Sequence, residues 1–132
     1  MDTIKFMIPG KPEYLTMVRL AISSVATTCG FDLDAIEDIK TAVGEACKHV
    51  SCHGFDGYSD QYEVICYAEQ KHLEIRVKDA CDTHSLEKLS RQCRNCPQDG
   101  DLGVFVIKSL MNEVSFCKTE DDRNEIVMIK RG

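Results

Sequence analysis

The chain has 132 residues, of which 43% are hydrophobic and 29% charged, and its formal net charge is -6 at pH 7. This length suits one domain spanning residues 1–132 with a substantial core. The acidic balance argues against a general nucleic-acid binder and against tight adhesion to an anionic membrane. No apolar run approaches the roughly 20 residues that cross a bilayer. The first residues lack the pattern of an export signal, so we expect a cytoplasmic protein.

The chain contains eight cysteines, which is many for this length. Without an export signal we expect reduced thiols rather than disulfides. Cys29, Cys47 and Cys66 lie in apolar patterns, which predicts that they are small core residues. Residues 93–96 form a lone CxxC pair, whereas a structural zinc site usually needs a second pair or spaced histidines. The spacing therefore does not favour structural zinc.

The N-terminal third predicts a strand followed by a helix. Ile4, Phe6 and Ile8 alternate with other residues until Pro9-Gly10 ends the run, which is typical of a short strand. Lys11-Pro12-Glu13 opens the helix, because proline is tolerated in a first turn. Cys29-Gly30 closes the helix, and Arg19 lies off its apolar face. That face consists of Leu15, Val18, Ile22 and Val25.

A second helix carries the most informative stretch, residues 41–54. Asp32 or Asp34 is its predicted N-cap, and Gly54 is a plausible stop. Glu45 and His49 lie one turn apart, so they are neighbours on a face away from the core. A carboxylate beside an imidazole is compatible with a site, but this stretch alone favours a solvated helix face. The predicted core face consists of Ile36, Ile39, Val43, Cys47 and Val50.

The remainder of the chain predicts strands around one further helix. Strands over 62–68 and 73–77 form a hairpin that ends at Asp79, and residues 80–101 read as a surface loop with a short helix around 85–94. Gly100 and Gly103 precede an apolar helix, where backbone N–H groups can cradle an anion. Strands over 113–116 and 125–129 follow, joined by a turn at 120–124. This order predicts an α+β two-layer sandwich, with a mostly antiparallel mixed sheet and helices on one face.

Several short motifs recur in a recognisable order. Val18-Arg19-Leu20 and the run 36–43 precede Glu45-Ala46-Cys47, Val77-Lys78-Asp79 ends the hairpin, and Gly100-Asp101-Leu102-Gly103 opens the last helix. In this order and at these intervals, the motifs resemble the anti-sigma factors with serine-protein kinase activity in the GHKL (Bergerat-fold) ATPase superfamily. The resemblance covers nearly the whole chain.

The resemblance implies a role in partner switching that controls bacterial transcription. Such a protein binds a sigma factor in one state and phosphorylates a serine of an anti-sigma antagonist in another, using ATP and Mg²⁺, and it is expected to be a homodimer without direct nucleic-acid or membrane contact. Arg19 matches the position that faces the protein partner, and Glu45 matches the general base. The implied nucleotide-binding positions are His49 (at the Mg²⁺-ligand position), Asp79, Cys81, Gly100, Leu102, Gly103 and Val104.

The chain departs from the family pattern at several of these positions. His49 replaces an asparagine, and Mg²⁺ prefers oxygen ligands whereas imidazole suits transition metals. The run 79–83 lacks both glycines of the family's Asp-x-Gly-x-Gly, where close backbone approach is needed. Asp101 replaces a glycine in the phosphate box and brings a negative charge there. Arg123-Asn124 stands where the family has Gly-Thr.

Three functions therefore remain open. The first is an active anti-sigma kinase, and the second is a catalytically inactive module that binds partners through the face around Arg19. The third is a metal or redox sensor. In that case the converging residues would be His49, Cys52, His53, Cys81, His84, Cys93 and Cys96. Each implied site residue also has a plain structural interpretation, such as a loop cap for Asp79 or a tight turn for the glycines.

Overall fold

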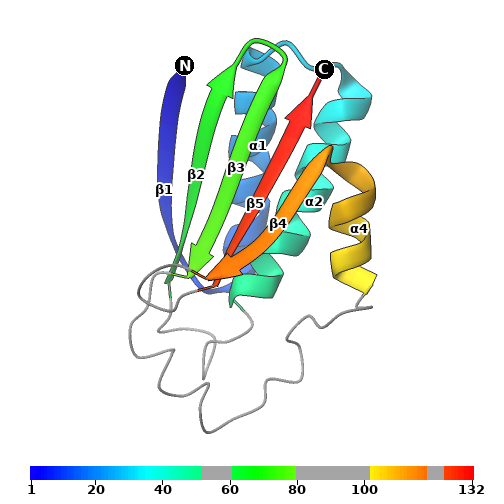
Figure 1. Cartoon of the computed structure of the whole chain (residues 1–132). Helices are drawn as coiled ribbons and strands as arrows, with labels where there is room; N and C mark the ends of the chain where they lie inside the picture. The colour runs from blue at the N-terminus through cyan, green and yellow to red at the C-terminus, as the bar shows by residue number, and fades with distance from the viewer. Residues whose placement is uncertain (52–60, 80–101, 119–123) are drawn as a thin grey trace, which may run out of the picture.

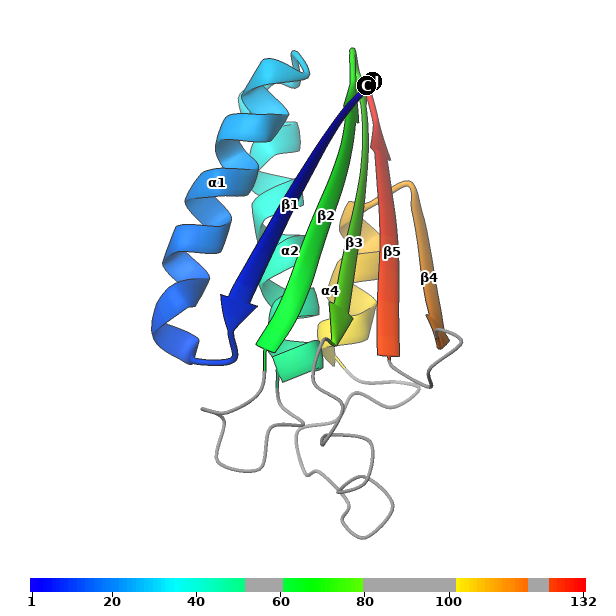
Figure 2. The same ribbon diagram turned by 90° about the vertical axis from the view of Figure 1, so that its left-hand side faces the viewer.

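The structure is a computed structural model, which describes residues 1–51, 61–79, 102–118 and 124–132. These residues form one five-stranded sheet, with α1, α2 and α4 together on one of its faces (Figures 1 and 2). The predicted two-layer α+β sandwich is confirmed. In chain order the elements are β1 (Asp2–Pro9), the 3₁₀ turn η1 (Pro12–Tyr14), α1 (Leu15–Thr28), α2 (Leu33–Ser51), β2 (Gln61–Glu69), β3 (His72–Asp79), α4 (Leu102–Leu110), β4 (Glu113–Lys118) and β5 (Asn124–Arg131).

The strand order in the sheet is β1-β2-β3-β5-β4, and every described pairing is antiparallel. The predicted hairpin of β2 and β3 is confirmed, with Glu69 opposite His72 and a two-residue turn between them. Lys71 in that turn has a φ of 58°, an uncommon value for a residue with a side chain. Its N–H donates to the Cys29 carbonyl and its carbonyl accepts from the Gly132 N–H, both at 2.8 Å. These two bonds fix the turn against the end of α1 and the C-terminal residue.

The core lies between the sheet and the helices, as the alternation in the strands predicts. On α2 the predicted face is buried, with Ile39, Val43 and Cys47 each 0% exposed. Burying an aliphatic side chain of this size stabilises the fold by about 1.5–3 kcal/mol. The side chain of Val50, the last predicted member of that face, lies outside the described residues. The facing strand residues include Val64, Cys66, Leu73, Ile75, Val77, Ile126 and Met128.

The predicted end of the first helix and one of the two predicted caps of the second are confirmed, whereas Pro12–Tyr14, predicted to open the first helix, form the 3₁₀ turn η1 and α1 begins at Leu15. Asp32 is the N-cap of α2, because its Oδ1 accepts a hydrogen bond of 2.9 Å from the Ala35 N–H. Gly30 ends α1 with a φ of 87°, and the Phe31 N–H returns to the Ala26 carbonyl at 3.3 Å. The predicted Gly54 stop and the helix around 85–94 lie outside the described residues. Among those described, no helix has the length and apolar character needed to cross a membrane.

A lysine on β5 joins three elements on the helix side of the sheet. Lys130 Nζ donates to the carbonyl of Leu110, the last residue of α4, at 2.7 Å. The same nitrogen lies 3.5 Å from Asp38 Oδ2 on α2, and the lysine side chain is only 16% exposed. Lys130 therefore satisfies an end carbonyl of α4 and places a positive charge where the helix dipole favours one.

Replacing Lys130 with Met should lower the free energy of unfolding by about 1–2 kcal/mol, since the hydrogen bond and the helix-end charge are lost while the stem is kept. Urea denaturation measures this change. Lys40→Met is the matched control, because Lys40 pairs with Glu37 at 3.2 Å on the surface of α2. Such pairs contribute about 0.5 kcal/mol or less. Equal losses in the two variants would contradict the role given to Lys130.

Candidate functional site

Three elements meet at the end of the molecule opposite the chain termini. There α2 reaches Ser51, β3 ends at Asp79 and α4 begins at Leu102 (Figure 1). The same helix α2 packs against α4 and against β3. The fold therefore brings together the segments that carry Glu45, Asp79 and Gly103, although they are far apart in the sequence.

Glu45 lies on the last two turns of α2, away from the buried face. Its side chain is 30% exposed, and its Oε1 lies 3.5 Å from Lys48 Nζ. A surface pair of this kind contributes only about 0–1 kcal/mol, so it does not fix the carboxylate rigidly. His49 follows one turn later on the same helix, and its side chain lies outside the described residues. The predicted carboxylate–imidazole pair thus remains a prediction at the level of side chains.

Asp79 is the last residue of β3, and its position in the sheet is fixed by the register. It stands directly opposite Tyr62 of β2. Residues paired in this way lie on the same face of an antiparallel sheet. Tyr62 is 1% exposed and belongs to the core between sheet and helices, so position 79 lies on the helix-covered face. A cleft between Glu45 and Asp79 stays a prediction.

The predicted phosphate cradle lies only partly within the described chain. Gly103 and Val104 are in the first turn of α4, and both are partly buried. Leu102 begins the helix, whereas Cys81 and Gly100 lie outside the described residues. The first N–H groups of a helix lack partners within it and can donate to an anion. The start of α4 lies at the same end of the molecule as the end of α2 and the end of β3.

Comparison with known proteins identifies the family of this chain. Residues 8–130 match the family model of the histidine kinase-like ATPase domain. The chain is 35% identical to the serine-protein kinase RsbW of Listeria monocytogenes serovar 1/2a, over 98% of this chain and 87% of that protein. It is 32% identical to the serine-protein kinase RsbW of Oceanobacillus iheyensis, over 86% of this chain and 77% of that protein.

The chain belongs to the RsbW-like branch of the histidine kinase-like ATPase family. A solved structure agrees on the fold. The RsbU and RsbW domains of Rv1364c from Mycobacterium tuberculosis match with a TM-score of 0.70 and 14% identity, over 99% of this chain and 32% of that one. The predicted resemblance is therefore confirmed, and so is the predicted GHKL-type fold.

The residues of this RsbW-like chain fit the two expected ligands unequally. A carboxylate at position 79 can accept a hydrogen bond from an exocyclic amino group, as an adenine base requires. Histidine at position 49 offers nitrogen where a hard, octahedral Mg²⁺ ion prefers oxygen. The residue at position 79 thus fits an adenine base, whereas the residue at position 49 fits direct magnesium coordination poorly.

Arg19 takes a position that the sequence did not predict. Its guanidinium lies against Gly44 of α2, on the side of that helix facing α1. Arg19 is therefore only partly exposed. Neither Gly44 nor Tyr62 was predicted from the sequence to be a functional residue. The sequence did contain a signal for Gly44. A glycine inside a helix destabilises it by about 1 kcal/mol relative to alanine, so a glycine there often has a packing or functional role.

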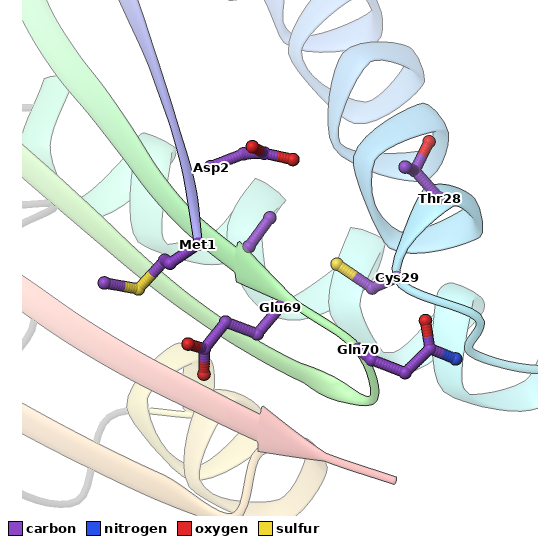
Figure 3. A pocket seen from close by; sticks show the side chains of 7 residues that line it. Met1, Asp2, Thr28, Cys29, Glu69 and Gln70 are labelled. Atoms are coloured by element: carbon purple, nitrogen blue, oxygen red, sulfur yellow. The ribbon is translucent and has the colours of Figure 1, made fainter.

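A pocket of about 340 Å³ lies at the other end of the sheet (Figure 3). It is beside the β2–β3 turn and the end of α1, away from Glu45 and Asp79, and no predicted site residue lines it. The two carboxylates among its lining residues do not by themselves make a ligand site. The lining residues are Met1, Asp2, Thr28, Cys29, Ala68, Glu69 and Gln70.

The described cysteines confirm the prediction of buried core thiols. Cys29, Cys47 and Cys66 are free and buried, whereas Cys117 on β4 is free and exposed. Burial raises the pKa of Cys47 and that of Cys66 to about 12, so both are neutral thiols near pH 7. Within the described ranges, no three His, Cys, Asp or Glu residues form a group that could hold a metal ion. Apart from His49, whose side chain is not described, the residues proposed for a metal or redox sensor lie outside those ranges.

Native protein at pH 8 should resist iodoacetamide at Cys29, Cys47 and Cys66, because a buried neutral thiol is a poor nucleophile. All three should react once urea unfolds the chain, and Cys117 should react in both states. Peptide mapping by mass spectrometry resolves each site. Rapid native labelling at Cys47 or Cys66 would contradict the burial described here and would favour a redox role.

Proposed function

We propose that this chain is an anti-sigma factor that uses ATP to phosphorylate a serine of an anti-sigma antagonist, and that it acts in the bacterial cytoplasm. The observation that carries the proposal is the meeting of α2, the end of β3 and the start of α4 at one end of the molecule. In this proposal Glu45 acts as the general base, Asp79 holds the adenine base, and the backbone at Gly103 and Val104 donates to phosphates. Gly100, Leu102 and Cys81 complete the nucleotide-binding positions. His49 occupies the magnesium-ligand position.

The outer face of α1 is the proposed docking surface for protein partners. Arg19 is the only charged residue of this 14-residue helix. Met17 and Leu20 on the same helix are 49% and 64% exposed, although they are apolar. An exposed, nearly uncharged helix face beside a single cation is suited to a protein interface, where charged residues are scarce at the centre and arginine is enriched. A homodimer is proposed from the family resemblance only.

The replacement of the family asparagine by His49 favours a second candidate function. A module that binds its partners without phosphoryl transfer would keep the α1 face and would not need a magnesium ligand. Phosphoryl transfer is mostly positioning and charge neutralisation, so a lost magnesium ligand weakens it strongly. The two candidate functions differ in whether phosphate is transferred from ATP, and both use the α1 face to bind partners.

Transfer of phosphate from radiolabelled Mg-ATP to purified candidate antagonists of the same organism tests the proposal. We expect serine-linked label with the wild-type chain and at least about a 100-fold loss with Glu45→Gln, because a general base contributes about 10²–10⁴-fold. Glu37→Gln, which removes an exposed carboxylate from the first turns of α2, is the control. A stable complex with a sigma factor or antagonist but no labelled serine would instead establish the binding module.

A further inference from the structure

Gly44 stands in an unusual place for a glycine. It is buried in the middle of α2, where its backbone is helical and does not need a positive φ. A glycine there destabilises the helix relative to alanine. The reason must therefore be space, and the structure shows what fills it. A Cβ atom at position 44 would lie 2.7 Å from Arg19 Nε, 2.8 Å from Nη2 and 3.2 Å from Cζ.

The guanidinium that fills this space comes from α1, and its charge acts on a buried thiol of α2. Burial raises the pKa of the Cys47 thiol, and the Tyr62 hydroxyl and the positive charge of Arg19 both oppose that rise. The Tyr62 hydroxyl is also buried and, among the described residues, has no hydrogen-bond partner of good geometry. The nearby Cys47 thiol raises the pKa of Tyr62 further after burial itself. Arg19, Cys47 and Tyr62 thus form a polar seam between α1, α2 and β2.

The Arg19 guanidinium has no carboxylate partner among the described residues that would hold it in this seam. Within the described part of the chain, the side chain is therefore held by the packing of its stem and by the shape of the surface that it contacts. The shape is set at Gly44, since any side chain there would occupy the volume of the guanidinium. The position of Arg19 therefore depends on a residue of the helix that carries Glu45.

We infer that Gly44 is a positioning residue: the space that it leaves on α2, here called the seat, holds the Arg19 guanidinium and so determines how far the Arg19 charge is available on the α1 face. The inference rests on the proposed function for its role in partner binding. A partner that uses the Arg19 charge must draw the side chain out of this seat, whose shape α2 supplies. The conformation of Arg19 on the docking helix α1 therefore depends on α2, the helix that carries Glu45 of the candidate nucleotide site.

The rate at which phenylglyoxal modifies Arg19, followed by peptide mass spectrometry, tests the seat without nucleotide or partner. In Gly44→Ala the new methyl group displaces the Arg19 guanidinium from the seat. Because the modification rate rises with the fraction of time that the guanidinium spends outside the seat, modification of Arg19 should be at least about threefold faster. Arg131 on β5, whose side chain is 49% exposed, is the internal reference and should not change. Thr41→Ala, an exposed helix-favouring change on α2, is the matched control and should leave both rates unchanged.

Melting temperatures distinguish two reasons for a glycine at position 44: space for the Arg19 side chain, or close contact between the backbones of two helices. The obstructing atoms belong to the flexible end of Arg19, so Gly44→Ala should fold and should not lower the melting temperature. In an Arg19→Ala background the same change should raise the melting temperature further, because no side chain has to be displaced. Equal Arg19 modification rates in wild type and Gly44→Ala, or failure of Gly44→Ala to fold, would overturn the inference. Neither result depends on whether the chain binds ATP, so the proposed function is tested separately.

Discussion

Asp79→Asn should weaken ATP binding by about 10–150-fold, the equivalent of the 1.5–3 kcal/mol that a hydrogen bond to a charged group contributes. The carboxylate at the end of β3 is proposed to accept a hydrogen bond from the adenine amino group. An asparagine can present its NH₂ group there instead, and two donors then face each other. Isothermal titration calorimetry with ATP measures the change, and GTP should bind no better to the variant than to wild type.

The matched control for this change is Asp2→Asn. Asp2 is the exposed first residue of β1, and that strand begins at the end of the molecule where the chain termini lie, opposite the candidate site (Figure 1). Asp2→Asn changes the net charge of the protein by the same amount as Asp79→Asn. A general electrostatic effect on ATP affinity would therefore appear equally in both variants. Unchanged affinity in Asp79→Asn would remove position 79 from the site, and equal losses in both variants would assign the effect to net charge.

His49→Asn should tighten Mg-ATP binding by about tenfold, or roughly 1.4 kcal/mol, and should leave binding of ATP in EDTA nearly unchanged. An amide oxygen is a hard ligand that suits Mg²⁺, whereas the imidazole of His49 offers nitrogen. The informative quantity is the ratio of the two dissociation constants, with and without the metal. A gain that depends on Mg²⁺ would show that the site keeps its shape and lacks one ligand.

His72→Asn is the matched control, because it makes the same chemical change on β3 at the far end of that strand. It should alter neither dissociation constant. If His49→Asn fails to increase the dependence on Mg²⁺, position 49 is not where the metal binds. The kinase interpretation would then have to place the metal elsewhere, or yield to the binding module.

Much of the fold could be predicted because its signals are local. The period-2 alternation in β1, β2 and β3 identifies these strands, and the 3.6-residue repeat of Ile39, Val43 and Cys47 identifies the buried face of α2. The caps at Gly30 and Asp32 follow from single-residue chemistry. Even the buried cysteines follow from their apolar neighbours, since a free thiol behaves as a small hydrophobic group.

The features that could not be predicted depend on contacts between distant segments. The pairing of β3 with β5, which places β5 between β3 and β4, joins strands separated by α4. Nothing local in either strand specifies that partner. The seat of Arg19 on Gly44 likewise depends on the packing of α1 against α2, so the sequence placed Arg19 on an outer face only. At the candidate site the register locates position 79, whereas Cys81 and Gly100 lie outside the described residues.

The most direct measurement is a calorimetric titration of the wild-type chain with ATP, in the presence and in the absence of Mg²⁺. A nucleotide site formed by α2, the end of β3 and the start of α4 predicts saturable binding at one site per chain, with a dissociation constant near the micromolar range, equivalent to about -8 kcal/mol. Absence of saturable ATP binding under both conditions would contradict the account. The chain would then have to act through its α1 face as a binding module without a nucleotide.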